Sequence, residues 1–170
     1  LSLDYEDPAW TPRIGIVAGP FADMSDLETR ANLHQVSEAL ASAGAIVDFI
    51  DLPDSVLGIN EAQLLIDYSE AAQVHREMHS KRAVDIAPNV RSRIEVGQLI
   101  PASAYVQSQQ LRRRFRQEME DAIGGAFDAL LAPATPAVAP TPETTGNPAF
   151  QAPWTTAGLP ALNIPTALNP

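Results

Sequence analysis

Cysteine is absent from this 170-residue chain, which excludes a disulfide framework and thiolate metal sites. Lysine occurs once, as Lys81, and charged residues make up only 19% of the sequence. No apolar run approaches the roughly 18 residues of a membrane-spanning helix. The net charge of −10 argues against a nucleic-acid partner, because an acidic surface repels phosphates. The composition therefore indicates a globular domain with neither a nucleic-acid nor a membrane partner.

A secretory signal is also missing from the first residues. Asp4, Glu6 and Asp7 follow Leu1 closely, where a signal peptide would carry positive charge and then an apolar stretch. We therefore expect a cytoplasmic protein, and a chain that is truncated at both ends of its domain.

The C-terminal segment 132–170 is rich in proline and poor in charge. It holds nine of the fifteen prolines and a single charged residue, Glu143. A disordered tail would carry more charge and fewer large apolar side chains. This segment contains Phe150, Trp154, Leu159, Leu162 and Ile164. We expect an ordered loop that lies against other protein, followed by a buried strand.

The first fifty residues predict a strand, a helix and a second strand. Residues 13–18 and 45–50 are short β-branched runs, typical of buried parallel strands. Ser25 and Glu28 have the spacing of a capping box, which predicts the start of the helix. Gly44 is expected to end it. The two strands should be parallel neighbours joined by a right-handed crossover.

Further along, the pattern predicts a helix from about Asn60 to about Arg82 and another that Ser103 caps and Gly124 ends. Two charge-poor segments, 127–131 and 159–164, predict interior strands that lie side by side in the complete fold. The expected fold class is α/β, with a mixed central sheet and helices on both faces. We expect residues 1–170 to form a single partial domain.

Several short motifs occur in one order along nearly the whole chain. They are Arg13–Ile16, Glu70–Ala72 with His75, Arg91–Glu95 with Gly97, Phe127–Asp128, Pro133–Pro136, and Gly158–Leu162 running into Ile164–Pro165. No single motif is unique, but the ordered set resembles the amidase signature family.

This resemblance implies amide hydrolysis by a Ser–Ser–Lys triad, with the middle serine on a cis peptide bond. Family members carry the triad in a glycine- and serine-rich half that precedes the motifs found here. No Gly-Gly-Ser-Ser run exists in this chain, and Lys81 fits a solvated cation near a helix end. The resemblance therefore implies no catalytic residues here, and a C-terminal half that is inactive alone but supplies sheet core and part of the substrate cleft.

The same resemblance implies no cofactor. The implied partners are the N-terminal catalytic half of the same protein and a small-molecule amide substrate, with a homodimer as a further option. Two alternatives remain open. One is a stand-alone, non-catalytic α/β binding or regulatory domain. The other is an allophanate- or carbamate-type hydrolase, which differs in the leaving group.

Three residues are candidates for substrate binding. Trp154 and Thr155 precede Gly158 in what the family uses as a helix or turn that lines its cleft, although a tryptophan can equally be core. Arg93 matches an arginine that holds the substrate carboxylate in glutamine-using relatives such as the A-type component of the amidotransferases; guanidinium suits that pairing. Arg91 and Arg93 are expected in a short irregular segment between Pro88 and Gly97. The alternative role of Arg93 is a structural ion pair with Glu95 or with a partner that this chain lacks.

Two other clusters predict no site. His75 and His79 lie four residues apart, but glutamate does not directly follow the first histidine as a zincin motif requires, so we expect no metal. The arginines between Arg112 and Arg116 are expected to form a solvated helix face that pairs with nearby acids, with Phe115 turned inward.

Overall fold

The computed structural model describes residues 10–17, 19–138, 140–141, 144 and 146–166. The chain divides into two compact units. The first comprises Leu1–Leu52, Glu120–Phe150 and Leu162–Pro170, and the second comprises Pro53–Met119 and Gln151–Ala161.

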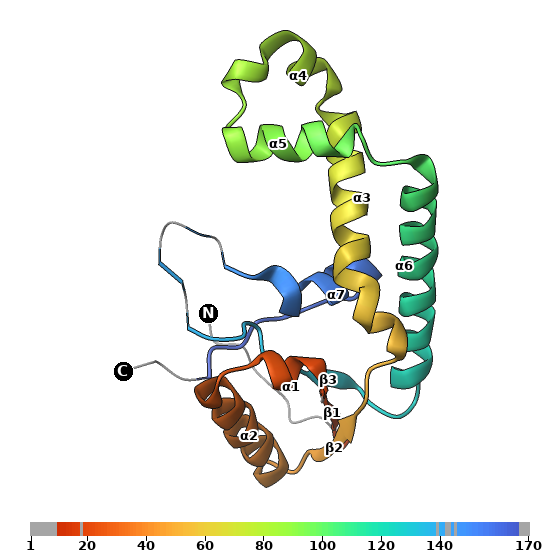
Figure 1. Cartoon of the computed structure of the whole chain (residues 1–170). Helices are drawn as coiled ribbons and strands as arrows, with labels where there is room; N and C mark the ends of the chain where they lie inside the picture. Colours follow the sequence, from red (N-terminus) through yellow and green to blue (C-terminus); the bar gives the residue numbers. More distant parts are fainter. Residues whose placement is uncertain (1–9, 18, 139, 142–143, 145, 167–170) are drawn as a thin grey trace. The chain divides into compact units, whose positions relative to one another are not determined.

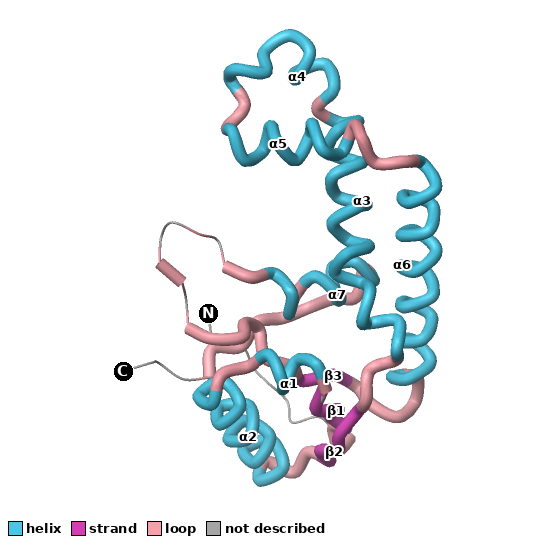
Figure 2. The backbone as a smooth tube through the Cα atoms, viewed as in Figure 1, coloured by secondary structure: helices cyan, strands magenta, loops and turns pink. Residues whose placement is uncertain are grey.

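The first unit is built on a three-stranded sheet (Figures 1 and 2). Its strands are β1 (Arg13–Val17), β2 (Ile46–Ile50) and β3 (Ala129–Leu131), in the order β2-β1-β3. Both pairings are parallel, with Ile14 of β1 opposite Val47 on one side and Ala129 on the other. The α/β class is thereby confirmed, as are the first two strands. The described sheet is, however, purely parallel, which corrects the prediction of a mixed one.

Two helices, α1 (Pro20–Met24) and α2 (Leu27–Ser42), connect β1 to β2. The predicted N-cap of α2 is wrong. The carboxylate of Asp26 accepts from the backbone N–H of Thr29 at 2.7 Å, whereas the Ser25 hydroxyl donates to the carbonyl of Phe21 at 2.7 Å. Asp26 takes the role because its side chain lies one residue nearer the first free N–H groups. Gly44 follows the C-cap with a φ of +97°, which confirms its predicted role.

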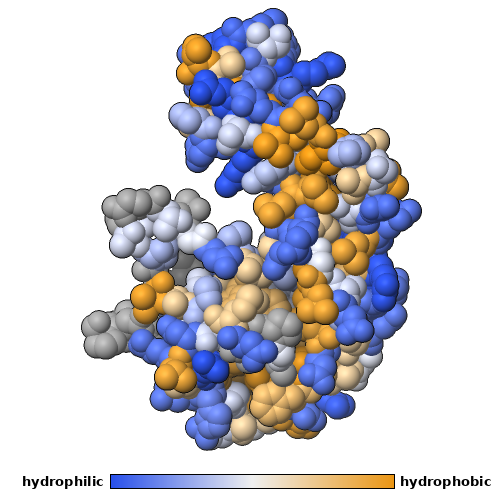
Figure 3. All heavy atoms as spheres, viewed as in Figure 1, coloured by the Kyte–Doolittle hydropathy of each residue, from blue (hydrophilic) through white to orange (hydrophobic). Residues whose placement is uncertain are grey.

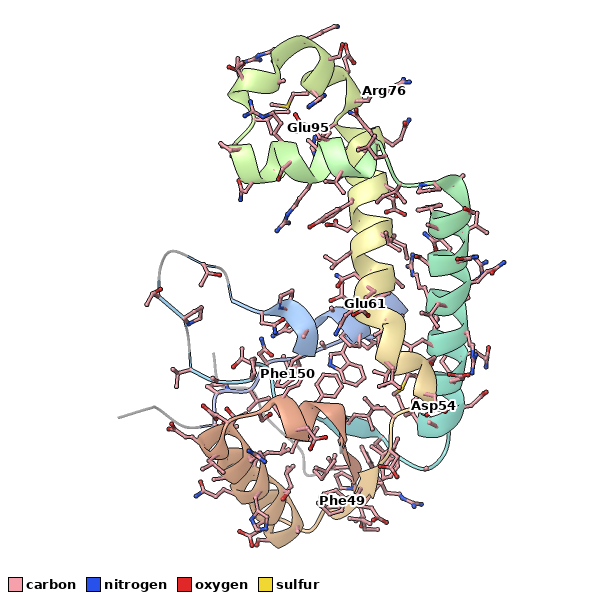
Figure 4. All side chains as sticks on the ribbon, in the orientation of Figure 1. Phe49, Asp54, Glu61, Arg76, Glu95 and Phe150 are labelled. Carbon is pink, nitrogen blue, oxygen red and sulfur yellow. The ribbon has the colours of Figure 1, made fainter. Side chains whose placement is uncertain are left out.

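The sheet is closed by contacts across a long sequence separation. The backbone N–H of Arg13 donates to the Asp128 carboxylate at 2.7 Å, and the backbone N–H of Asp128 donates to the Arg13 carbonyl at 2.8 Å. Phe21 and Phe150 are buried and their ring centroids lie 5.0 Å apart. Figure 4 shows Phe150 directed toward α1. These contacts tie the later part of the chain to its first strand and helix.

The second unit is helical. Its helices are α3 (Ile59–Val74), α4 (Arg76–Arg82), α5 (Pro88–Gly97), most of α6 (Ala102–Ile123) and α7 (Ala152–Ala157). Short 3-10 turns lie at Asp54–Gly58 and Ala83–Asp85 in this unit, and at Pro148–Phe150 in the first. Within the described part of the chain, no helix combines the length and apolarity that a bilayer crossing demands.

The structure corrects two helix predictions in this unit. The single helix expected from Asn60 to Arg82 is interrupted at His75, whose φ and ψ of −93° and 8° are not helical, so α3 and α4 are separate. The helix predicted after it corresponds to α6. This helix begins at Ala102 and is not capped by Ser103, and the Pro101 carbonyl accepts from the N–H of Ala104 at 3.0 Å. Its predicted end at Gly124 is confirmed, because α6 stops at Ile123.

The segment 159–164, predicted as an interior strand of the complete fold, forms coil in this chain. Leu162 and Ile164 are 84% and 66% exposed. The prediction of a neighbouring buried strand at 127–131 is partly right, since β3 begins at Ala129 but is only half-buried. Both predictions assumed that segments 127–131 and 159–164 pair with each other. Among the three described strands, β3 pairs with β1 instead. Exposed apolar side chains consequently occur among polar ones on the visible surface (Figure 3).

Candidate functional site

Two of the candidate binding residues, Trp154 and Thr155, lie on α7. Pro153 stands in the first turn of this helix, where a missing N–H costs nothing. Gly158 ends the helix with a φ of +71°, a left-handed conformation that glycine adopts without strain. The backbone N–H groups of Gly158 and Leu159 then donate to the carbonyls of Thr155 and Trp154, at 3.1 and 3.0 Å. The prediction of a helix or turn before Gly158 is confirmed.

The burial of α7 separates its residues into two groups. Ala152, Pro153, Thr156 and Ala157 are buried, whereas Thr155 is exposed and Trp154 is half-buried. Trp154 thus has neither the full burial of a core residue nor the exposure of a surface residue.

Thr156 is a residue that the sequence reasoning missed. It is 6% exposed, and its hydroxyl oxygen has no hydrogen-bond partner among the described residues. A buried hydroxyl without a partner carries a desolvation cost. Nothing in the local sequence distinguishes it from Thr155, so no pattern could have identified it.

The arginines of α6 do not all form the expected solvated face. Arg112 is half-buried, and its Nε donates to the carbonyl of Thr156 at 2.8 Å. A Cβ atom built on Gly158 would lie 3.6 Å from Nη1 of Arg116. The prediction is therefore wrong for Arg112, which contacts the end of α7. The inward orientation of Phe115 is confirmed by its complete burial.

The predicted pairing of this arginine run with acids is confirmed for Arg114. The Nε of Arg114 donates to Oε1 of Glu118 at 2.6 Å, and the Ser55 hydroxyl donates to the other oxygen of that carboxylate. The Ser55 hydrogen bond, followed by the Arg114 guanidinium, lowers the pKa of Glu118. Glu118 in turn raises the pKa of Arg114. This cluster joins α6 to the turn that precedes α3.

Arg93 lies on α5, which is a regular helix, and not in the irregular segment that the sequence suggested. Its guanidinium carbon is 6.0 Å from the ring centroid of Tyr68 on α3. Glu95 instead contacts Arg91 at 3.9 Å and His79 at 3.4 Å, on the side of α5 that faces α4 in Figure 4. Residues two apart on a helix point in different directions, so the predicted Arg93–Glu95 pair is wrong. The structure brings Arg93 to α3 and keeps Trp154 with Thr155 on α7.

The described residues provide no evident metal centre. Within the described ranges, no group of three or more histidine, cysteine or acidic side chains could hold an ion. His75 stands at the break between α3 and α4, while His79 contacts Glu95.

Two surface hollows occur in the second unit, and neither is lined by Trp154, Thr155 or Arg93. The larger, of about 510 Å³, lies between α3, α4 and α5 and is lined in part by Gln73, Arg76 and His79. The smaller, of about 240 Å³, is lined in part by Met78, Ile86 and Ile94.

Comparison with known proteins identifies related sequences. The chain matches the family model described as Amidase over residues 6–170. It is 30% identical over 128 residues to AtzE, a component of the 1-carboxybiuret hydrolase of Pseudomonas sp. (strain ADP); the match covers 75% of this chain and 27% of the relative. A second relative is the A component of the glutamyl-tRNA(Gln) amidotransferase of Azorhizobium caulinodans, with 24% identity over an alignment 201 residues long. This match covers 98% of this chain and 41% of the relative.

Solved structures agree with these matches. A protein from a vestigial complex, described as revealing the evolutionary origins of an s-triazine catabolic enzyme, superimposes with a TM-score of 0.73 and 28% identity, over 86% of this chain and 34% of that one. A crystal structure of an amidase gives 0.77 at 24% identity, over 92% and 40%, and so supports the fold alone. The chain spans only 27% to 41% of the length of the curated relatives.

Proposed function

This chain belongs to the amidase family, and from that premise we propose that it is the non-triad portion of a Ser–Ser–Lys amidase. The complete enzyme would hydrolyse a small-molecule carboxamide to a carboxylate and ammonia or an amine. The family match over residues 6–170 is the observation that carries this proposal. We further propose that both compact units belong to one partial amidase domain.

The surroundings of Lys81 support the view that the triad lies outside this chain. Its ammonium group contacts the carboxylate of Glu77 at 2.6 Å, and 69% of its side chain is exposed. A catalytic lysine base needs a partly desolvated position beside a nucleophile, which lowers its pKa. An exposed pair on a helix surface is the opposite environment. The nucleophile and the base should therefore come from the other half of the enzyme.

The role proposed for this chain is to supply sheet core and one wall of the substrate cleft. Trp154 and Thr155 would form that wall, since α7 packs against α3 and leaves Thr155 exposed. The partners would be the catalytic half of the same protein and the amide substrate, in the cytoplasm and without a cofactor. A homodimer is compatible with this assignment.

A carbamate- or allophanate-type substrate is the second candidate. The relative that shares 30% identity is a component of a 1-carboxybiuret hydrolase, whose substrate name denotes a carboxyl group. Arg93 is exposed and its guanidinium could pair with such a carboxylate. No observation favours a stand-alone binding domain.

The first experiment compares residues 1–170 alone with the same chain combined with a triad-containing half. Ammonia release is measured with simple aliphatic, aryl and biuret-type amides. We expect no turnover from residues 1–170 alone and turnover from the combination. Turnover by the isolated chain that disappears in Lys81→Ala would contradict the proposal. The intact mass of the natural gene product would show whether both halves share one polypeptide.

The second experiment tests Trp154 in the reconstituted enzyme. Trp154→Ala should change kcat/KM differently for different acyl groups, by at most a few kcal/mol in transition-state free energy. Trp10, which is 55% exposed, provides a matched Trp→Ala control. A core role would instead lower stability by roughly 3–5 kcal/mol and reduce activity on all substrates alike. That uniform loss would remove Trp154 from the cleft.

A further inference from the structure

Helix α7 is too short to hold its own shape. It has six residues, and isolated helices shorter than about 12 residues are marginal in water. The last carbonyls of a helix also have no partner within it. The position of α7 must therefore come from contacts that other segments make with it.

One such contact reaches α7 from α6. The Nε of Arg112 donates to the Thr156 carbonyl at 2.8 Å, across 44 residues of sequence. The group is half-buried, which reduces competition from water. Its positive charge also lies at the C-terminal end of the helix, where the helix dipole favours a cation.

The threonine itself cannot replace this bond. A hydroxyl can donate as well as accept, but the Thr156 hydroxyl is buried and makes no hydrogen bond to any described residue, so it does not serve the Thr156 carbonyl. The glycine that follows, Gly158, is used for the turn, and its N–H is already donated to the Thr155 carbonyl. The guanidinium of Arg112 is therefore the donor that the structure supplies to this carbonyl.

We propose that Arg112 is a positioning residue that holds the end of α7 and thereby fixes Trp154 and Thr155 as the wall of the substrate cleft. The inference rests on the proposed function, because it assigns a task to the residues proposed for the cleft. Thr155 directly precedes the anchored carbonyl, and Trp154 is one residue further back. A loss of the anchor should loosen both residues while the rest of α6 stays in place.

The anchor is tested first in residues 1–170 alone, by amide hydrogen exchange resolved by NMR. Arg112→Ala should accelerate exchange at the amides of Thr155, Gly158 and Leu159 by about tenfold, as expected for loss of one charge-assisted hydrogen bond. Arg113→Ala is the matched control, because Arg113 is the next residue of α6 and is exposed. It should leave these amides unchanged. Unchanged exchange in Arg112→Ala would refute the anchor.

Conservative variants keep the test decisive if Arg112→Ala does not fold. Arg112→Lys and Arg112→Gln both retain an N–H donor, but only the lysine variant also retains the positive charge. We expect Arg112→Lys to restore most of the slow exchange. Exchange in both variants as slow as in the unmodified chain supports donation as the cause, whereas fast exchange in both would overturn it.

Activity is then measured in the enzyme reconstituted with a triad-containing half. Arg112→Ala should raise KM about tenfold and alter acyl preference with a smaller change in kcat, and Arg112→Lys should recover most of the loss. A purely structural role would lower kcat and melting temperature together for every substrate, which would refute the positioning role. Absence of turnover in the unmodified enzyme would contradict the proposed function, while the exchange experiment still decides the anchor.

Discussion

Replacement of Gly97 by alanine should separate two helices that now touch. A Cβ atom at position 97 of α5 would lie 1.9 Å from the carbonyl oxygen of Tyr68 and 2.6 Å from its carbonyl carbon. It would also lie 2.9 Å from the Cβ of Ala72. The obstacle is the backbone of α3 and not the end of a flexible side chain. The helices would therefore have to move apart by more than about 1 Å, since carbon and oxygen atoms normally stay about 3.3 Å apart.

Two effects of opposite sign determine how much Gly97→Ala changes the free energy of unfolding. Alanine is favoured over glycine inside a helix by about 1 kcal/mol. Overpacking a filled interface costs about 1–3 kcal/mol, and sometimes more, and a shift of about 1 Å also forfeits much of the dispersion energy between α3 and α5. With backbone as the obstacle, the upper part of that range applies. We therefore expect a net loss of about 2 kcal/mol in the free energy of unfolding.

Thermal unfolding followed by circular dichroism at the helical band gives the measurement. A loss of about 2 kcal/mol should lower the melting temperature by roughly 4–8 °C in a chain of this length. Gly58→Ala is the matched control, because its new Cβ would meet only the side-chain end of Leu111, at 3.2 Å. That variant should melt within about 2 °C of the unmodified protein. A melting temperature of Gly97→Ala at or above the unmodified value would refute the reasoning.

Two further predictions concern a core aromatic and a carboxylate. Phe150→Ala should lower the free energy of unfolding by about 3–5 kcal/mol in urea titrations, because the ring is 1% exposed. The control Phe49→Ala, at a site that is 75% exposed, should lower it far less. Similar losses in the two variants would contradict the assignment of Phe150 to the core. The pKa of Glu118 is lowered by Ser55 and Arg114, so its stabilising effect is complete above its ordinary value of 4.5 and disappears as the pH falls through the lower folded value. The stability difference between the unmodified protein and Glu118→Gln should therefore shrink as the pH falls below 4.5, and a difference that stays constant as the solution is acidified would refute the assignment.

The elements that the sequence predicted well are those that depend on neighbouring residues. The β-branched run 13–18 and the glycine at 44 determine β1 and the end of α2 by local preference, and the structure confirms both. The break at His75 has no such signal, because neither proline nor glycine marks it. The segment 159–164 forms coil in this chain because a strand needs a partner, and apolar composition does not supply one.

In the candidate site, too, features with a local sequence signal could be predicted, and features that depend on distant contacts could not. The helix carrying Trp154 could be anticipated from Pro153 and Gly158, which mark its two ends. Arg112 could not be separated from its neighbouring arginines by sequence, because its distinction is a hydrogen bond to a carbonyl 44 residues away. Arg93 was placed beside the wrong partner because α5 was not expected to be a helix.

The pairing of β1 with β3 also constrains the order in which this chain can fold. Arg13 and Asp128 are 115 residues apart, so β1 can join only β2 until the ribosome has released the later strand. The helices from Ile59 to Met119 are synthesised in that interval, and their local contacts form quickly. Their unit still lacks Gln151–Ala161, just as the sheet unit lacks β3. Both units therefore await residues from the last third of the chain, and a nascent chain stopped near Met119 would expose an unfinished sheet edge to aggregation.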